Sequence, residues 1–214
     1  MKTFYLWDLA GTLFPEQWNG TKSGVASYDA YVKSLGYDLK TISAHDYEWS
    51  HKIPYGGGLY NLSIAEGFKK VLLWTKNNSI FTTGNKEQID WRAKQLFKKY
   101  HFDIRKYTKE IHSTFDYGNT NIKTQEMLMD IILKKYKQGY RVFIYTDDKR
   151  KNCIFFLKAI QILVKKGYSI KTRVYYLKGK GRGIKKINNS LIKVGGLLNL
   201  LHYERMVDKK HKMR

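Results

Sequence analysis

Apolar residues along the chain follow two patterns that alternate, short runs of strand length and longer stretches at helical spacing. Residues 4–7 are the first apolar run, and residues 142–145, which follow Arg141, are another. Between residues 123 and 138 apolar side chains recur at helical spacing, as Met127 with Ile131 and Leu128 with Ile132. Strands that alternate with helices are typical of a parallel sheet covered by helices, so the pattern predicts an α/β fold.

The predicted elements succeed one another regularly after residue 62. Besides the opening strand, which ends at Asp8, we expect strands at residues 79–83, 110–114, 141–145 and 171–177. We expect helices at residues 62–76, 86–100, 123–138 and 152–166, and a last one between residues 191 and 206. Gly139 should end the third helix, because glycine commonly follows the last helical residue. These runs predict a parallel sheet of about five strands.

The alternation is lost between the first strand and residue 61. Residues 15–60 are rich in Gly, Ser, Tyr and Trp, with a helical pattern around residues 25–35. We interpret this segment as a small helical cap inserted after the first strand. The α/β core would then comprise residues 1–14 and 61–206, and residues 207–214 would form a basic, frayed tail.

Chemically reactive side chains fall at the ends of the predicted strands. Asp8 ends the first strand and Thr82 lies at the end of the second. Lys123 opens the helix after the third strand, and Asp147 with Asp148 ends the fourth. Sites in parallel α/β sheets form in the crevice at the carboxyl ends of the strands. We therefore expect these side chains to meet.

This order of carboxylate, hydroxyl, cation and acidic pair resembles the four motifs of the haloacid dehalogenase (HAD) superfamily of hydrolases. The motif Asp-x-Ala-Gly-Thr occupies residues 8–12, Thr-Thr-Gly-Asn occupies residues 82–85, and Thr-Asp-Asp occupies residues 146–148. The resemblance covers roughly residues 3–177. It implies a Rossmann-like α/β fold and an aspartate that attacks phosphorus or carbon.

The resemblance also implies a metal site. Asp8 would be both the nucleophile and a ligand, with the backbone carbonyl of Ala10 as a second ligand and Asp148 as a third. Asp147 would either hold the cluster together or replace Asp148 as the ligand. Mg²⁺ suits an oxygen-lined site, and a cation there relieves the repulsion between a carboxylate and an anionic phosphate.

The remaining motif residues would bind the substrate. Thr82 would hydrogen-bond the phosphoryl oxygens, and Lys123 would neutralise charge on Asp8 and on the phosphoryl group. Asn152 would either orient the metal ligands or only cap its helix. The other residues expected to bind substrate are Gly11, Thr12, Thr83 and Gly84.

Simpler structural interpretations of these residues stay open. Thr82 would then satisfy only local backbone groups, and Lys123 would be a solvated residue at a helix start. The acids Asp147 and Asp148 would cap a helix amino terminus.

Ala10 departs from the pattern of the superfamily's phosphatases, which carry a second aspartate two residues after the nucleophile. That aspartate protonates the leaving alcohol and later activates water, which contributes roughly 10²- to 10⁴-fold in rate. The phosphonoacetaldehyde hydrolase branch shares Asp-x-Ala-Gly-Thr and uses a lysine of its cap as a Schiff base. Cap lysines available here are Lys22, Lys33, Lys40 and Lys52.

Two other interpretations of Ala10 remain. The dehalogenase branch also lacks the second acid, but it works without metal and lacks an acidic pair in the fourth motif, so Asp147 and Asp148 argue against it. Alternatively, catalysis is weakened or lost and the fold serves binding.

The charge of the chain favours a polyanionic partner. The 40 Lys and Arg against 18 Asp and Glu give a formal net charge of +22, which attracts nucleic acid. Residues 178–214 contribute 11 Lys and Arg and two acids, a net +9. This basic surface and many aromatic residues would suit RNA or a ribonucleoprotein. The competing interpretation is a compositional bias with the charge spread over solvated faces.

Localisation follows from what the sequence lacks. No apolar stretch reaches the roughly 20 residues of a membrane span, and no signal core precedes the first strand. The only cysteine, Cys153, cannot form an internal disulfide. We therefore expect a cytoplasmic protein without a membrane partner.

Together these observations predict a Mg²⁺-dependent hydrolase of phosphatase or phosphonatase type. It would act through an aspartyl-phosphate at Asp8 on a small phosphorylated substrate. The alternative is a catalytically weakened protein of the same fold that serves as a basic RNA- or ribonucleoprotein-binding module. The identity of the substrate and the oligomeric state do not follow from the sequence.

Overall fold

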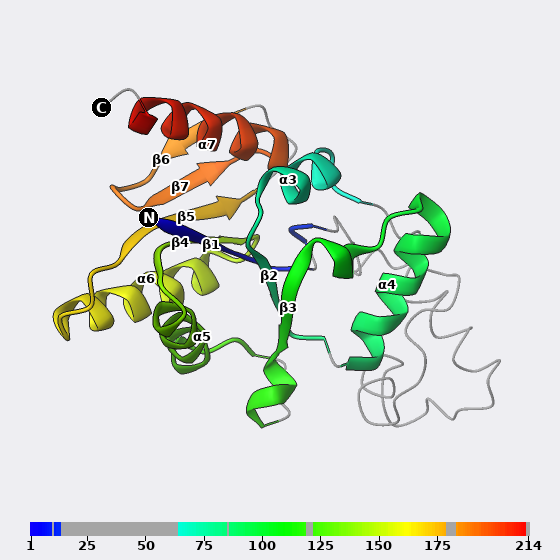
Figure 1. Ribbon diagram of the computed structural model, residues 1–214, viewed down its shortest axis with the longest axis horizontal. Coiled ribbons are helices and arrows are strands. Elements are labelled where there is room, and N and C mark those ends of the chain that lie inside the picture. Colours follow the sequence, from blue (N-terminus) through cyan, green and yellow to red (C-terminus); the bar gives the residue numbers. More distant parts are fainter. Residues whose placement is uncertain (10, 14–63, 85, 119–121, 179–182, 213–214) are drawn as a thin grey trace. The chain divides into compact units, whose positions relative to one another are not determined.

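The computed structural model describes residues 1–9, 11–13, 64–84, 86–118, 122–178 and 183–212 (Figure 1). The chain divides into two compact units. The first comprises Met1–Pro15, Ile64–Thr83 and Arg105–Arg214, and the second includes Gly84–Ile104. The cap expected at residues 15–60 lies outside the described residues, so the domain boundaries stay a prediction. Ala10 also lies outside the described residues.

A seven-stranded sheet forms the centre of the first unit, in the order β3-β2-β1-β4-β5-β7-β6. The strands are β1 (Lys2–Trp7), β2 (Asn78–Thr82), β3 (Thr108–Ser113), β4 (Tyr140–Asp147), β5 (Lys171–Leu177), β6 (Ile184–Lys186) and β7 (Leu191–Val194). All neighbouring strands run parallel except β6, which is antiparallel to β7. The α/β, Rossmann-like prediction is therefore confirmed.

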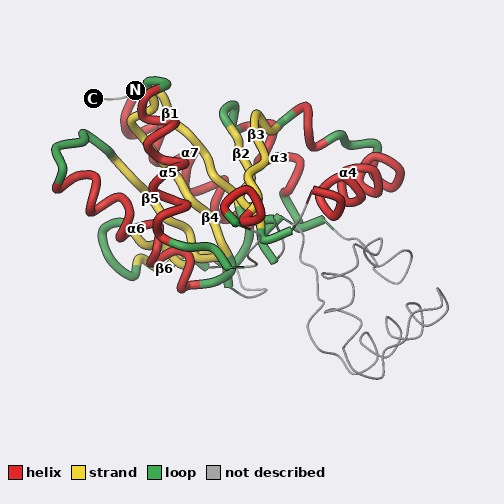
Figure 2. The backbone as a smooth tube through the Cα atoms, turned by 90° about the horizontal axis from the view of Figure 1, so that it is seen from below, coloured by secondary structure: helices red, strands yellow, loops and turns green. Residues whose placement is uncertain are grey.

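Helices cover both faces of this sheet. They are α3 (Phe68–Trp74), α5 (Gln125–Lys137), α6 (Arg150–Lys165) and α7 (Leu197–Lys212), with the 3-10 turns η1 (Ile104–Lys106) and η2 (Thr114–Tyr117). Helix α4 (Lys86–Tyr100) belongs to the second unit. Helices α5 and α6 lie on one face and α3 and α7 on the other, as Figure 1 shows, and Figure 2 looks onto the face that carries α5 and α6. No helix in the described part of the chain has the length and hydrophobicity of a membrane span.

The sheet has two strands more than the five that were predicted. Residues 191–194 form β7 rather than the start of the last helix, and the short strand β6 lies outside every predicted strand. Leu191, Ile192 and Val194 are all buried. A short apolar run of this kind fits a strand as well as a helix, so its periodicity is not decisive.

Two helix ends also differ from the prediction. Helix α3 begins at Phe68, later than expected, because Gly67 before it has a left-handed φ of 86°. Helix α7 continues to Lys212, so residues 208–212 are helical rather than frayed. The other helix and strand ends lie within a few residues of their predicted positions, which is the usual uncertainty of such boundaries.

The core beneath α5 and α6 fixes the end of β4. Phe143 and Tyr145 of β4 are fully buried in one cluster with Phe156 of α6 and Leu128 of α5. The rings of Tyr145 and Phe156 stack with their centroids 4.7 Å apart. Because close-packed side chains keep one rotamer, Tyr145 presents its hydroxyl in a fixed position at the carboxyl end of the strand.

On the opposite face, a buried ion pair fastens α7 to β5. The side chain of Glu204 is completely buried, and both of its oxygens accept hydrogen bonds from Arg173, at 2.7 Å from Nε and 2.6 Å from Nη2. The hydroxyl of Tyr175 donates a further hydrogen bond to Glu204. Such a bidentate pair is strongly directional, and removal of one partner leaves the other charge without compensation.

Replacing Glu204 with alanine should therefore destabilise the protein by about 3 kcal/mol, because it leaves Arg173 and Tyr175 unpaired. Urea denaturation measures this free energy of unfolding. Asp208→Ala, which removes an exposed acid one turn later in α7, should change it by no more than about 0.5 kcal/mol. Equal losses in the two variants would show that the buried pair contributes nothing specific.

Candidate active site

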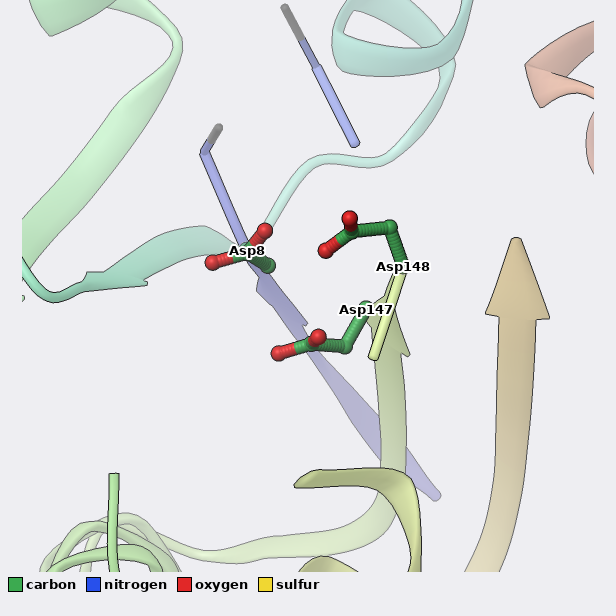
Figure 3. Close-up of side chains that lie close together, drawn as sticks. All are labelled: Asp8, Asp147 and Asp148. Carbon is green, nitrogen blue, oxygen red and sulfur yellow. The ribbon is translucent and has the colours of Figure 1, made fainter. Parts of the chain in front are cut away.

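Three carboxylates converge at the carboxyl edge of the sheet (Figure 3). Asp8 directly follows β1, and Asp147 and Asp148 stand at the end of the neighbouring strand β4. The N–H of Asp8 donates to the carbonyl of Thr146 at 2.8 Å, which joins the two strand ends. One oxygen of each carboxylate lies within 4.8 Å of the others. The structure thus brings together three residues that are up to 140 positions apart in sequence.

The turn after Asp8 passes close to Asp148. Gly11 has a left-handed φ of 83°, and a Cβ atom at this position would lie 2.4 Å from Oδ2 of Asp148. A larger residue here would therefore strain the backbone and displace the carboxylate of Asp148. The buried hydroxyl of Thr12 donates to Oδ2 of Asp8 at 3.2 Å. Two residues predicted to bind substrate, Gly11 and Thr12, thus shape the surroundings of Asp148 and Asp8.

Lys123 lies between two of the carboxylates. Its buried ammonium donates to Oδ1 of Asp8 and, at 2.9 Å, to Oδ2 of Asp147. Thr124, the next residue, caps α5 by accepting a hydrogen bond from the N–H of Met127, so the start of the helix sets the position of the lysine. Burial acts to lower the pKa of Lys123, but Asp147 and Asp8 outweigh it and raise the pKa. The lysine therefore stays charged.

Asp147 is fully buried and is saturated with hydrogen bonds. The N–H of Lys149 donates to Oδ1 at 2.8 Å, and Nδ2 of Asn152 lies 3.2 Å from Oδ1 and 3.1 Å from Oδ2. The hydroxyl of Tyr145 and the ammonium of Lys123 both donate to Oδ2. With every direction occupied, this carboxylate acts as an anchor for its neighbours. Asn152 contacts the acidic cluster directly.

Asp148 is in the opposite situation. Its Oδ1 atom is buried and accepts no hydrogen bond from any residue that the structure describes. Burial raises the pKa of Asp148, and the charge of Asp147 raises it further. A buried carboxylate oxygen without a partner is unfavourable, and such a group calls for a ligand that supplies the missing interaction.

The buried groups of the site carry more negative than positive charge. The cluster holds three carboxylates and one ammonium, which pairs with two of them. Burial raises the pKa of Asp8 to about 7, Lys123 opposes this shift, and Asp147 and Asp148 add to it. The ionised form of Asp8 is therefore destabilised by its surroundings, so a cation among these oxygens would be electrostatically favourable. Carboxylate oxygens are the ligands that Mg²⁺ and Ca²⁺ prefer.

The other predicted residues occupy different places. Thr82 is buried at the end of β2, the neighbour of β1 on the side away from β4, and Thr83 follows it. Both lie at the same edge of the sheet as Asp8. Gly84 belongs to the second unit, and Ala10 lies outside the described residues, so their expected contacts stay predictions.

The sequence interpretation missed Tyr145. Its hydroxyl donates to Asp147 and lies 3.5 Å from the ammonium of Lys123. Burial, with the charge of Asp147, raises the pKa of this hydroxyl well above its ordinary value, so it stays protonated and donates. Residues two apart on a strand share a face, so counting back from Asp147 would have found it.

The single cysteine lies beneath this cluster. The thiol of Cys153 is fully buried and lies 3.7 Å from the carbonyl oxygens of Asp147 and Tyr175. Burial, followed by the charge of Asp147, raises its pKa. The thiol is therefore a packed part of the floor of the site rather than a reactive thiolate.

No protein-family model and no curated sequence relative matches this chain. The structure, however, resembles solved structures. A HAD-superfamily hydrolase from Ehrlichia chaffeensis aligns with a TM-score of 0.51 over 94% of each chain at 13% identity. A HAD family enzyme from Bacteroides thetaiotaomicron, solved in complex with magnesium and inorganic phosphate, aligns with a TM-score of 0.50 over 83% of this chain and 94% of that chain, also at 13% identity.

Because the sequence identity is low, these similarities concern the fold alone. They agree with the motif order in the sequence and with the parallel sheet that carries the acidic cluster at its carboxyl edge. The chain therefore has the fold of the haloacid dehalogenase superfamily of hydrolases.

Proposed function

We propose that this protein is a Mg²⁺-dependent hydrolase of phosphate compounds in which Asp8 is the nucleophile. The observation that carries the proposal is the combination at one sheet edge of Asp8, Asp148 and the buried Lys123. A carboxylate beside a fixed ammonium and an excess of negative charge suits transfer of a phosphoryl group in the presence of a cation.

Asp8 and Asp148 are the side chains best suited to hold Mg²⁺. The oxygens of Asp147 are occupied by Lys123, Asn152 and Tyr145, whereas Oδ1 of Asp148 lacks any hydrogen bond from the described residues. By resemblance, the backbone carbonyl of Ala10 would supply a further ligand. When bound, Mg²⁺ would reduce the repulsion between the carboxylate of Asp8 and the anionic substrate.

The chemistry then divides among the protein groups. An oxygen of Asp8 forms a bond to phosphorus while the bond from phosphorus to the leaving group breaks, which gives an aspartyl-phosphate. Water then attacks phosphorus, the bond between phosphorus and the Asp8 oxygen breaks, and inorganic phosphate leaves with the carboxylate regenerated. Lys123 keeps Asp8 in position and offsets charge on the phosphoryl group, and Thr82 donates to a phosphoryl oxygen. Asp147, with Tyr145 and Asn152, orients Lys123.

Alanine at position 10 narrows the range of substrates. The chain lacks the carboxyl group that would protonate a leaving alcohol two residues after the nucleophile. We therefore propose substrates whose leaving group departs without that proton, such as acyl phosphates, or phosphonates activated by a lysine of the cap. Simple alkyl phosphates should be poor substrates, because an alkoxide is a poor leaving group.

Asp8→Asn tests the nucleophile. In a hydrolysis screen over phosphate esters, acyl phosphates and phosphonates with added Mg²⁺, this variant should lose activity by about 10³-fold or more, since an amide does not form the covalent intermediate. Glu126→Gln, an exposed acid in the first turn of α5, provides the control and should keep full activity. If the wild-type protein and Asp8→Asn are equally inactive on the whole panel, the proposed function is wrong.

Ala10→Asp tests the interpretation of the missing acid. Restoring a carboxyl group should raise kcat on alkyl phosphates by about 10²-fold or more, because general acid catalysis becomes available. The rate on acyl phosphates should change little, since their leaving group needs no proton. The measurement is the ratio of the two rates in each variant. An unchanged ratio would contradict the assignment of Ala10.

Gly11→Ala tests the metal site without removing a ligand. The new methyl group would collide with Asp148, so the increase in Tm caused by Mg²⁺ should be largely lost. Gly139→Ala is the matched control, because Gly139 has a similar left-handed φ of 89° but nothing within 4 Å of an added Cβ. Both variants should lose about 1 to 2 kcal/mol through backbone strain.

The two glycine variants separate strain from metal binding. Gly139→Ala should keep the wild-type response to Mg²⁺ despite its lower Tm. An equal Mg²⁺ response in both variants would show that Asp148 takes no part in binding the cation.

A further inference from the structure

One long segment of the chain contains no acidic residue. Residues 149–203 hold 14 Lys and Arg and no Asp or Glu. These 55 residues, about a quarter of the chain, therefore supply 14 of the net 22 positive charges. A general bias toward lysine would enrich cations everywhere, but it would not remove every acid from one segment. The positive charge is thus unevenly distributed along the chain.

This acid-free segment forms one side of the sheet. It builds α6, β5, β6, β7 and the first half of α7. Most of its cations are exposed, namely Lys149, Arg150, Lys151, Lys158, Lys165, Lys166, Lys171, Lys178, Lys185, Lys186 and Lys193. Among the described ion pairs, only Arg173 of this segment takes part, with Glu204. Outside the segment, Lys123, Lys134 and Lys135 each pair with an acid, as Lys134 does with Asp130.

Three of the exposed lysines form a stripe along α6. Lys151, Lys158 and Lys165 are seven residues apart, which is close to two helical turns, so they share the side of the helix that faces solvent. The opposite side of α6 is buried through Cys153 and Phe156. At 1.5 Å per residue the stripe is about 21 Å long.

Two more lysines lie on the same face of the sheet, on β7 and β6. Leu191 packs into the cluster beneath α6, so its side of β7 faces that helix. Lys193, two residues later, shares this face, and Lys185 of β6 stands directly opposite Lys193 in the antiparallel pair. Like charges in such a pair destabilise a sheet unless an anion compensates them. We call the five residues Lys151, Lys158, Lys165, Lys185 and Lys193 the lysine face.

The lysine face begins beside the candidate active site. Asp147 is in register with Tyr176 of β5, Tyr176 with Lys193, and Lys193 with Lys185. Neighbouring strands are about 4.8 Å apart, so this row places β6 roughly 14 Å from β4 across the sheet. The row ends at Asp147, which belongs to the acidic cluster.

We propose that the lysine face binds a nucleic-acid strand through its backbone phosphates. The lysines are spread over about 20 Å rather than gathered around one point, which suits a ligand with many negative charges better than a single phosphate group. Lysine contacts phosphate as a point charge, so the binding is independent of sequence and weakens as salt rises.

The binding of a fluorescein-labelled 20-nucleotide single-stranded RNA, followed by fluorescence anisotropy over a range of salt concentrations, tests this proposal. The triple variant Lys158→Glu, Lys185→Glu, Lys193→Glu should bind at least about tenfold more weakly than wild type at low salt. Its plot of log affinity against log salt should be shallower by about 2, since each phosphate contact on a single strand contributes roughly 0.7 to the slope.

The matched control reverses three exposed lysines outside the acid-free segment, Lys106→Glu, Lys109→Glu and Lys137→Glu. It changes the net charge by the same amount and should weaken binding less than about threefold. A second variant, Lys151→Gln, Lys158→Gln, Lys165→Gln, neutralises only the stripe on α6. Glutamine has nearly the helix propensity of lysine, so this variant keeps the test valid if the first one unfolds.

Three results would overturn the proposal. RNA that does not bind at low salt would exclude the interaction. Equal weakening in the lysine-face variant and the control would show that only total charge matters. Tighter binding of the same surface to phosphatidylserine vesicles than to RNA would assign it to a lipid partner. Hydrolysis of small substrates is measured separately, so the proposed function does not depend on the outcome.

Discussion

The arrangement of the site depends on the buried ammonium of Lys123. A lysine without exposed surface is costly unless opposite charges surround it, and here the carboxylates of Asp8 and Asp147 do so. One of these follows β1 and the other ends β4, while the lysine precedes α5. The ion pairs therefore join two strand ends and a helix start at one point. Among the described groups of the cluster, Lys123 is the only buried cation, and its ion pairs are with Asp8 and Asp147. The third carboxylate, Asp148, therefore has no ion pair with a described residue.

Asp147 and Asp148 are adjacent in sequence and differ sharply in environment. Asp147 points into the protein, where Tyr145, Asn152 and Lys123 donate to it. Asp148 lies beside Gly11, and one of its oxygens has no donor in the described part of the chain. This difference favours a structural role for the first acid and a ligand role for the second. The sequence left open whether Asp147 holds the cluster together or replaces Asp148 as the ligand, because their side-chain partners come from distant elements.

Much of the fold and part of the site follow from local sequence signals. Strand β5 and helix α4 have the predicted bounds, because apolar runs and helical spacing are properties of contiguous residues. Asp8, Thr82 and Asp147 were found as polar residues at the ends of apolar runs. Strand β7 was missed because a four-residue buried run also fits a helix. Tyr145 was missed because its contribution lies in a contact with Asp147 and Lys123 that only the folded chain creates.

Cys153 gives this protein an internal probe of local opening. It is the only thiol in the chain, it is completely shielded, and its sulfur touches the carbonyl of Asp147. A thiol-specific reagent can reach it only when the start of α6 separates from the sheet, so the labelling rate reports the free energy of that separation. Any compound that bridges the acids above it should slow labelling. Binding at the cluster is thereby observable without an engineered reporter and without knowledge of the natural substrate.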